Sequence, residues 1–440
     1  MAKLFSKINK DAACLFFVAA AGFFFMLFFK EKHSISFMNL DEFLWMYRSR
    51  FFIDRIMGLD FGNLIQSSQP GIMVMWFAGP FMKLIDFDFT KIQLLIQNLN
   101  EAGGYNVIND TGRNYYVGYE FISFMFNIPV ILLMLVFFPA SYSLMRRLGI
   151  GRRAIFLSLL LIATTPYYVF FTTPTDKLVG IFSTLSILSF LVFLAKKGGK
   201  GFIYLSGFVG SWAALTKMSA LFLIPFFLFA LLVYVFKKSD LADLKVFQKK
   251  AGVCAKVFSG WLLAFIVTSI IFLPTIITDP RQVAGLFIRE SDSRYLIQNA
   301  EAQDPGSLSL FDSVRNYLED PFLPSFNFFV IMAFLAFLFL IIRRIEYKIN
   351  VRKEILLLYI FVFSFLIFSA TFSRTYSFRY IMPALVVFQI ISGWAVYEFF
   401  EIFRRKNSVY SRNEIFAWAV VVILISQALL IHYSEIAPIE

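Results

Sequence analysis

The sequence predicts an all-α, polytopic membrane protein, and three observations support this fold class. Of its 440 residues, 59% are hydrophobic and only 16% are charged, whereas soluble proteins contain roughly 45–50% apolar and about 25% charged residues. Phenylalanine alone contributes 59 residues, which is more aromatic surface than a water-soluble core of this size can bury. The apolar residues also form long runs, each near the roughly 20 residues with which a helix crosses a bilayer. We therefore expect a single integral membrane domain over residues 1–440.

Most of these runs are long enough to be transmembrane helices, and we expect about eleven of them. A further run, 71–85, has only 15 residues and contains Pro80 and Lys83. Because it is too short to span the membrane, we expect a re-entrant or interfacial helix there. The eleven expected transmembrane helices cover 12–29, 121–144, 154–171, 178–195, 202–217, 219–236, 257–278, 326–342, 355–372, 380–398 and 415–433.

The basic residues predict the orientation of the chain in the membrane. An excess of Lys and Arg in short loops marks the cytoplasmic side. Here 25 of the 41 lysines and arginines fall on one side, in the N-terminal tail and in the segments near 145–153, 196–201, 237–256, 343–354 and 399–414. We therefore expect a cytoplasmic N-terminus. The net charge of +12 is a signal of topology, and we expect no nucleic-acid partner.

The opposite, outer side receives the two long segments, 30–120 and 279–325. Since the inner segments are short, we expect the active site on the outer face. The chain has only two cysteines, Cys14 in the first apolar run and Cys254 in what we expect to be a basic loop. Two cysteines are too few for a disulfide framework or a thiolate metal site.

The first outer segment begins with an amphipathic helical pattern that is typical of a membrane interface. Trp45 and basic residues accompany its apolar positions, and Asp41 and Glu42 stand at its start. These acids either cap the helix, where the dipole favours negative charge, or one of them acts as a general base on an acceptor hydroxyl. Further along, Gln69 precedes a Pro-Gly turn that leads into the short apolar run.

Two charges at the outer ends of neighbouring runs are further candidates. Asp176 precedes the run 178–195 and either caps that helix or faces the first outer segment as a site residue. Lys217 is the one charge in a long apolar stretch, between the runs 202–217 and 219–236. It either snorkels to the surface or contacts an anionic group, because ionisable residues in such places are functional candidates.

A short outer link near residues 373–379 carries Arg374 and Arg379, and Tyr380 follows it. The two arginines are either interfacial anchors together with neighbouring tyrosines, or ligands of a phosphate. Arginine suits the second role because its planar guanidinium binds phosphate through two parallel hydrogen bonds.

In their order and sidedness these motifs resemble the GT-C superfamily of membrane glycosyltransferases. The resemblance is to the branch with protein O-mannosyltransferases, aminoarabinose transferases of lipid A and RgtA/B/C/D-like enzymes. It covers residues 10–240 and returns at 370–395. Its motifs are Asp41-Glu42, Gln69-Pro70-Gly71, the sequence RRLGIGRR at 146–153, Thr175-Asp176, the stretch ending at Lys217, and Arg379-Tyr380 followed by Pro383.

The resemblance implies transfer of a sugar from a polyprenyl-phosphate donor to a lipid, glycan or protein hydroxyl at the outer face, with inversion. It implies that Asp41, with Glu42 beside it, is the catalytic base and that Asp176 is a second essential carboxylate. One departure is that relatives often have His-Pro-Pro where this chain has Gln-Pro-Gly. The substrate-binding candidates are Gln69, Lys217, Arg374, Arg379 and Tyr380.

Two other function classes stay open at this stage. One is a ligase or polymerase of polyprenyl-linked oligosaccharides, for which the arginines of the segment 279–325 would be suited. The other is a transporter or flippase of lipid-linked sugars, which the scarcity of ionisable residues inside the runs disfavours. A divalent metal is left open by the resemblance, although the sequence has only two histidines and predicts no metal ligand. The sugar, the acceptor, the prenyl length and the oligomeric state are not predicted.

Overall fold

The computed structural model describes nine parts of the chain, and every regular element within them is a helix. In parts of some helices, including the first turn of α3, only the backbone is described. The described residues are 10–32, 40–64, 71–84, 120–164, 174–236, 243–285, 353–372, 382–406 and, in the last part, 411, 413–414 and 416–425.

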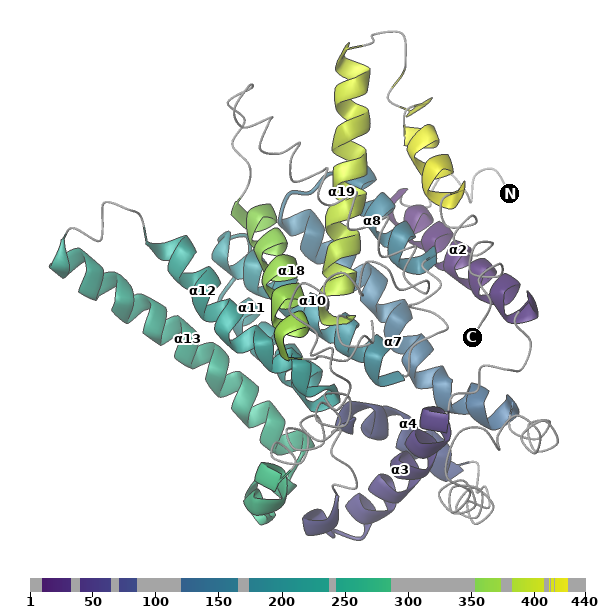
Figure 1. The fold of residues 1–440 in the computed structure, drawn as a ribbon, viewed down its shortest axis with the longest axis vertical. Coiled ribbons are helices and arrows are strands. Elements are labelled where there is room, and N and C mark those ends of the chain that lie inside the picture. The colour runs from purple at the N-terminus through teal and green to yellow at the C-terminus, as the bar shows by residue number, and fades with distance from the viewer. Residues whose placement is uncertain are drawn as a thin grey trace, which may run out of the picture.

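Most of the long helices form one bundle, and two helices from the segment 30–120 lie together at one of its ends (Figure 1). The bundle helices are α2 (Lys10–Lys32), α7 (Glu120–Arg147), α8 (Arg152–Thr164), α10 (Pro174–Leu194), α11 (Gly201–Thr216), α12 (Leu223–Val235), α13 (Leu244–Phe272), α18 (Lys353–Phe372) and α19 (Met382–Lys406). The helices at the end are α3 (Leu40–Met57) and α4 (Ile72–Leu84). The short elements include η1 (Phe61–Asn63), η4 (Met218–Phe222) and α14 (Thr275–Thr278), and Phe416–Ile425 is a further apolar helix.

Five helical stretches among the described residues are long and apolar enough to cross a membrane. Four shorter apolar helices accompany them, and α4 is one of these. The all-α membrane fold is therefore confirmed, whereas the total of about eleven spans stays a prediction. The expected run 326–342 lies outside the described residues. The five stretches are Met125–Arg147, Thr175–Leu194, Met218–Val235, Leu244–Phe272 and Met382–Glu401.

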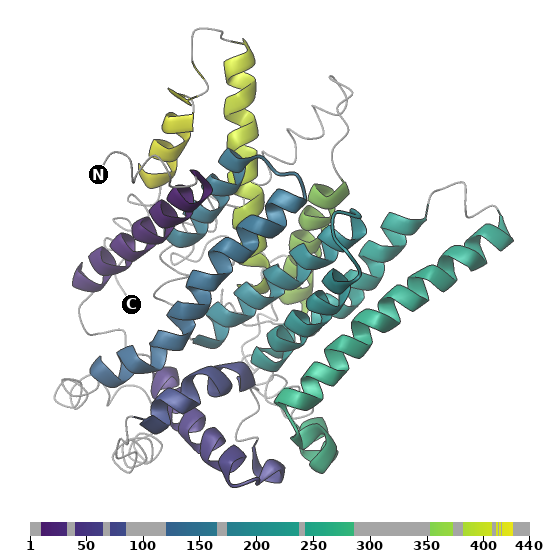
Figure 2. The same ribbon diagram turned by 180° about the vertical axis from the view of Figure 1, so that it is seen from behind.

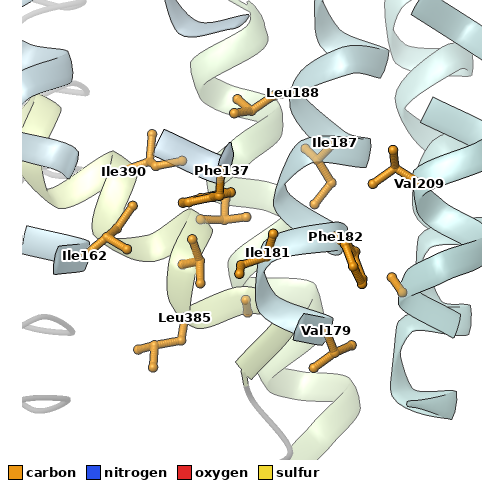
Figure 3. Close-up of a cluster of buried hydrophobic side chains, with 14 of the residues drawn as sticks. Phe137, Ile162, Val179, Ile181, Phe182, Ile187, Leu188, Val209, Leu385 and Ile390 are labelled. Carbon is orange, nitrogen blue, oxygen red and sulfur yellow. The ribbon is translucent and has the colours of Figure 1, made fainter. Parts of the chain in front are cut away.

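Helix α10 is the centre of the bundle, with 83% of its apolar stretch buried. It packs against α7, α11 and α19, and its Ile181, Phe182 and Leu188 lie among the side chains of those neighbours (Figure 3). Against α11 the packing is also polar, because Ser186 and Ser206 each donate a hydrogen bond to the other's carbonyl oxygen, at 2.7 and 2.8 Å. Reciprocal bonds of this kind fix the register of two helices in an apolar environment.

The helices α3 and α4 pack closely on each other and on the bundle (Figures 1 and 2). Gly79 of α4 allows this approach, because a Cβ atom there would lie 2.7 Å from the carbonyl oxygen of Ser49 in α3. Trp76 of α4 donates from its indole Nε1 to the carbonyl oxygen of Phe272, 2.7 Å away at the end of α13. The short run 71–85 thus forms a helix as expected, and it lies at the end of the bundle.

The basic residues expected on the inner side gather at the other ends of the helices that meet α3 and α4. Arg146 and Arg147 end α7, and Lys196 and Lys197 lie in the turn between α10 and α11. We name the end that holds α3 and α4 the site end, and the opposite one the basic end.

One expectation about the basic end is wrong. The expected loop 237–256 is largely helical, because α13 begins at Leu244 rather than at 257. Asp243 caps this start by accepting from the backbone N–H groups of Lys245 and Val246, at 2.9 and 3.2 Å. Cys254 therefore lies in a helix and is buried. Hydropathy marks where the apolar stretch ends, but the helix continues past it to a cap.

Candidate functional site

A buried ion pair joins two of the candidate residues at the site end. Lys217 Nζ donates to Asp176 Oδ1 over 2.6 Å, and the side chains are 13% and 0% exposed. Asp176 lies in the first turn of α10. Lys217 follows the last residue of α11 in an extended conformation, with φ −154° and ψ 131°. The break in the helix at Lys217 turns its side chain toward the start of α10, so the anionic group that this lysine contacts is a carboxylate of the same chain.

Burying the two charges of this ion pair costs free energy of hydration. A charge removed from water loses its hydration, and only a close counter-charge with further hydrogen bonds compensates for the loss. Removing one partner leaves the other charge buried and uncompensated, which typically costs more than the pair itself contributes. Asp176 and Lys217 therefore act as a unit, and neither can be replaced without consequences for the other.

The turn before α4 is attached directly beside this pair. The backbone N–H of Gly71 donates to the carbonyl oxygen of Thr216 over 3.2 Å, and Thr216 immediately precedes Lys217. Gly71 has a φ of +49°, a left-handed conformation that glycine adopts without steric cost. The glycine of the Gln-Pro-Gly motif thus connects the turn before α4 to the end of α11.

Trp45 of α3 lies against Gly71. A Cβ atom at Gly71 would be 2.0 Å from ring atoms of Trp45, and the indole itself is 1% exposed. The guanidinium of Arg48 lies 4.9 Å from the centre of the same ring, a distance at which a cation is attracted by the aromatic face. The sequence context of Trp45 suggested that this residue faces the membrane interface. In the structure it is instead buried within the protein.

Asp41 and Glu42 lie in the first turn of α3, about one helical turn before Trp45. Their backbone is therefore near the place where α3, the turn at Gly71 and the end of α11 meet. Their side chains are outside the described part of the chain. The position in the first turn is compatible with both alternatives, the helix cap and the general base.

A cluster of ion pairs joins α4 to α3 on the exposed side. Asp54 accepts from Arg50 Nε over 2.9 Å and from Lys83 Nζ over 2.6 Å. Arg50 also donates to the carbonyl oxygens of Met82 and Lys83, at 3.3 and 3.0 Å, which satisfies carbonyls that the end of a helix leaves open. Burial alone would raise the pKa of Asp54, but the hydrogen bonds from Lys83 and Arg50 outweigh it and lower that pKa.

Aromatic side chains fill the space between α4 and the bundle. Phe77 of α4 packs edge-on against Trp212 of α11, with ring centres 5.6 Å apart. Trp212 in turn meets Phe182 of α10 at 5.3 Å and Phe272 of α13 at 5.5 Å. Trp212 lies in α11 shortly before Lys217, so this packing supports the segment that carries the lysine.

The other candidates lie outside the described residues, namely Gln69, Arg374, Arg379 and Tyr380. Within the described part of the chain, no three side chains of His, Cys, Asp or Glu come together as metal ligands. Asp176 is already engaged by Lys217. The described residues thus do not fit a metal site, and no step below uses a metal.

Sequence reasoning singled out Asp176 and Lys217 separately but missed their pairing, and it missed the contact of Trp45 with Gly71. A signal for the pairing was available, because two opposite charges stood at the outer ends of adjacent helices in an otherwise apolar stretch. The contact with Trp45 had no such signal, since a tryptophan in an amphipathic helix is also typical of the membrane interface.

A family model and two solved structures are similar to this chain. Residues 120–272, less than half of the chain, match the family model of dolichyl-phosphate-mannose-protein mannosyltransferases. This segment contains α7 to α13 and hence both partners of the ion pair. No curated protein matches the chain.

Both solved structures are oligosaccharyltransferases from Archaeoglobus fulgidus. The apo form is 12% identical, with a TM-score of 0.51, and the similarity covers 97% of this chain and 56% of that one. AglB in complex with an inhibitory peptide and a dolichol-phosphate is 12% identical, with a TM-score of 0.50, covering 97% and 55%. The chain thus spans little more than half the length of these proteins, and at this identity the likeness concerns the fold.

The fold and the family model together support the class that the sequence motifs suggested, the GT-C superfamily of membrane glycosyltransferases. Within that superfamily, the bundle from α7 to α13 is similar to the protein mannosyltransferase family.

Proposed function

We propose that this protein transfers a sugar from a polyprenyl-phosphate donor to a hydroxyl group of a lipid, glycan or protein at the site end. The observation that carries the proposal is the buried pair of Asp176 and Lys217, next to the turn that holds the start of α3. A charged pair inside an apolar bundle is costly, and ionisable groups at membrane depth are functional candidates. We further propose that the site end is the outer face of the membrane and the basic end the cytoplasmic face, because basic residues gather on the cytoplasmic side.

The proposed reaction is a displacement at the anomeric carbon. The acceptor oxygen forms a bond to that carbon, the bond from carbon to the phosphate oxygen breaks, and the polyprenyl phosphate leaves with the electron pair. The proton of the acceptor hydroxyl goes to a carboxylate, for which we propose Asp41 with Glu42 beside it. Attack from the face opposite the leaving phosphate inverts the anomeric configuration.

The leaving phosphate gains negative charge as its bond to carbon breaks, and preorganised cations stabilise that charge. We propose Arg374 and Arg379 for this role, with Gln69 and Tyr380 in contact with the substrate. Lys217 was a third candidate for the phosphate. Since it already pairs with Asp176 over 2.6 Å, we propose that it acts on the phosphate only together with that carboxylate.

The proposal is tested by incubating the purified full-length protein, in lipid nanodiscs, with a panel of polyprenyl-phosphate sugars and candidate acceptors. Release of the polyprenyl phosphate and gain of one sugar on the acceptor are the expected results. Asp176→Asn should abolish both products. Asp243→Asn, at the basic end, is the matched control, because Asp243 caps α13 and lies far from the site end along the bundle. Transfer that is equal in all three proteins would contradict the proposal.

A second candidate is transfer of a whole oligosaccharide from a polyprenyl-linked donor. The likeness in fold to oligosaccharyltransferases favours it. The same panel separates the two candidates when it includes polyprenyl-diphosphate oligosaccharides. Gain of several sugars in one step, with release of polyprenyl diphosphate, would identify the second candidate.

A further inference from the structure

The contact between Gly71 and Trp45 has no role in the proposed chemistry, yet it imposes strict steric and backbone requirements on residue 71. Gly71 is buried and has a φ of +49°, and the indole of Trp45 occupies the space that a Cβ atom would need. A Cβ atom would be 2.0 Å from the indole carbons Cη2 and Cζ3. Any residue with a Cβ atom therefore meets a steric clash, and most residues also meet the cost of a left-handed backbone.

The same glycine holds the elements that carry the proposed catalytic groups. Its N–H group donates to the carbonyl oxygen of Thr216, the residue before Lys217. Its partner Trp45 follows the positions of Asp41 and Glu42 by about one turn of α3. Gly71 is thus in contact with both sides of the site, the start of α3 and the end of α11.

We propose that Gly71 and Trp45 form a positioning joint, which sets the distance between the first turn of α3 and the pair of Asp176 and Lys217. The proposal rests on the function proposed above. Neither residue of the joint takes part in bond making. The glycine allows the indole to approach, and the indole fixes where the helix with the two acids begins.

Position matters because a proton acceptor must be within hydrogen-bond reach of the attacking hydroxyl. A displacement of about 1 Å caused away from the reacting atoms can lower the rate about 10²-fold. Enlarging Gly71 would push Trp45 away and move the start of α3. Arg374 and Arg379, which we propose for the donor phosphate, lie on a different segment, so binding of the donor phosphate should change little.

The kinetic test compares Gly71→Ala with two control glycines. Gly62, in η1 of the same outer segment, has nothing within 4 Å of its Cβ position, so Gly62→Ala should keep wild-type kinetics. Gly393 in α19 would clash with the backbone of Ser158 at 2.4 Å, so Gly393→Ala reports the effect of general destabilisation. We expect Gly71→Ala to lower kcat about 10²-fold per folded molecule, with the KM for the donor unchanged. A loss that merely follows the folded fraction, as expected for Gly393→Ala, would overturn the proposal.

The double variant Trp45→Ala/Gly71→Ala tests whether the two residues act through one contact. If they do, its kcat should be no lower than that of the poorer single variant, because the contact is broken only once. Multiplicative losses would mean independent effects and would overturn the joint. Gly71→Asn separates the effect of the left-handed backbone from the effect of the steric clash. Asparagine tolerates a positive φ but brings the same Cβ atom, so it should be as impaired as Gly71→Ala.

A distance measurement tests whether Gly71 and Trp45 form this joint, and it does not depend on enzymatic activity. Spin labels are placed at Met57 near the end of α3, which is 65% exposed, and at Lys200, exposed at the basic end, with Cys14 and Cys254 replaced by alanine. We expect the distance distribution to shift or broaden in Gly71→Ala and to stay unchanged in Gly62→Ala. If wild type transfers no sugar, the proposed function fails, but this measurement still supports the joint. Unchanged distances in Gly71→Ala overturn the joint whatever the activity.

Discussion

Lys217 Nζ lies 2.6 Å from Asp176 Oδ1 and joins the end of α11 to the start of α10. Both charges are buried, since the side chains of Lys217 and Asp176 are 13% and 0% exposed. The two residues come from motifs 41 positions apart in the sequence. Removing either charge would leave the other buried without its partner.

The first prediction concerns the stability of this pair. Lys217→Met removes the counter-charge of a buried carboxylate and should destabilise the protein by roughly 3–5 kcal/mol, the usual cost of breaking a buried ion pair. Thermal unfolding in detergent measures the effect. The double variant Asp176→Asn/Lys217→Met should recover much of the stability, because no buried charge remains, but it should stay inactive. A double variant that is active would contradict the role proposed for the pair.

The second prediction separates the alternatives for the start of α3. If Asp41 is the catalytic base, Asp41→Asn should lower the rate of transfer by about 10²–10⁴-fold and leave the melting temperature nearly unchanged. If it only caps the helix, the variant should lose about 1 kcal/mol of stability and keep its activity. Glu42→Gln is the paired variant. Loss of activity in Glu42→Gln alone would assign the role of base to Glu42.

The third prediction concerns the charge cluster between α3 and α4. The pKa of Asp54 is lowered from its ordinary value of 3.8, so its stabilising contribution is complete above that pH. The contribution is lost as the pH falls through the lowered value. Asp54→Asn should therefore reduce stability by the same small amount from about pH 5 to about pH 8.

Each exposed ion pair of this cluster contributes only about 0.2–1 kcal/mol, and added salt screens it. The difference between wild type and Asp54→Asn should accordingly shrink in high salt and below the ordinary pKa. Melting curves over a pH series measure it. A difference that grows on acidification would show that the sign of the pKa shift is wrong.

The fourth prediction concerns the donor phosphate. Arg379→Ala should weaken the binding of polyprenyl phosphate, and Arg379→Lys should be nearly as impaired, because lysine retains the charge but not the planar pair of donors. Binding of radiolabelled polyprenyl phosphate to nanodiscs measures the affinity. Arg147→Ala, at the basic end of α7, serves as the control. If Arg379 and Arg374 can both be replaced without loss of affinity, they are interfacial anchors and the phosphate ligand lies elsewhere.

Much of the fold was predictable because a bilayer imposes a simple rule on sequence. A helix that spans the membrane must be apolar over about 20 residues. The runs at 121–144 and 178–195 therefore correspond closely to α7 and α10. The short run with Pro80 was recognisable as a different element for the same reason. The start of α13 was not predictable from hydropathy, because its first turns are polar and depend on the cap at Asp243.

The candidate site was predictable in composition but not in geometry. Asp176 and Lys217 were conspicuous as charges in an apolar sequence, yet their pairing depends on the helix break that gives Lys217 an extended backbone. The role of Gly71 depends on a positive φ and on the position of Trp45. Both are properties of the packed structure, which periodicity and composition do not determine.

The most direct test of the account is to locate the bound donor. A polyprenyl phosphate with a photoreactive group near its phosphate is cross-linked to the full-length protein in nanodiscs, and the labelled peptides are identified by mass spectrometry. Labelling is expected at the site end, at the starts of α3 and α10 and at the end of α11, with competition by unlabelled polyprenyl phosphate. Competable labelling confined to the basic end, or to the lipid-facing surface of α13, would contradict it.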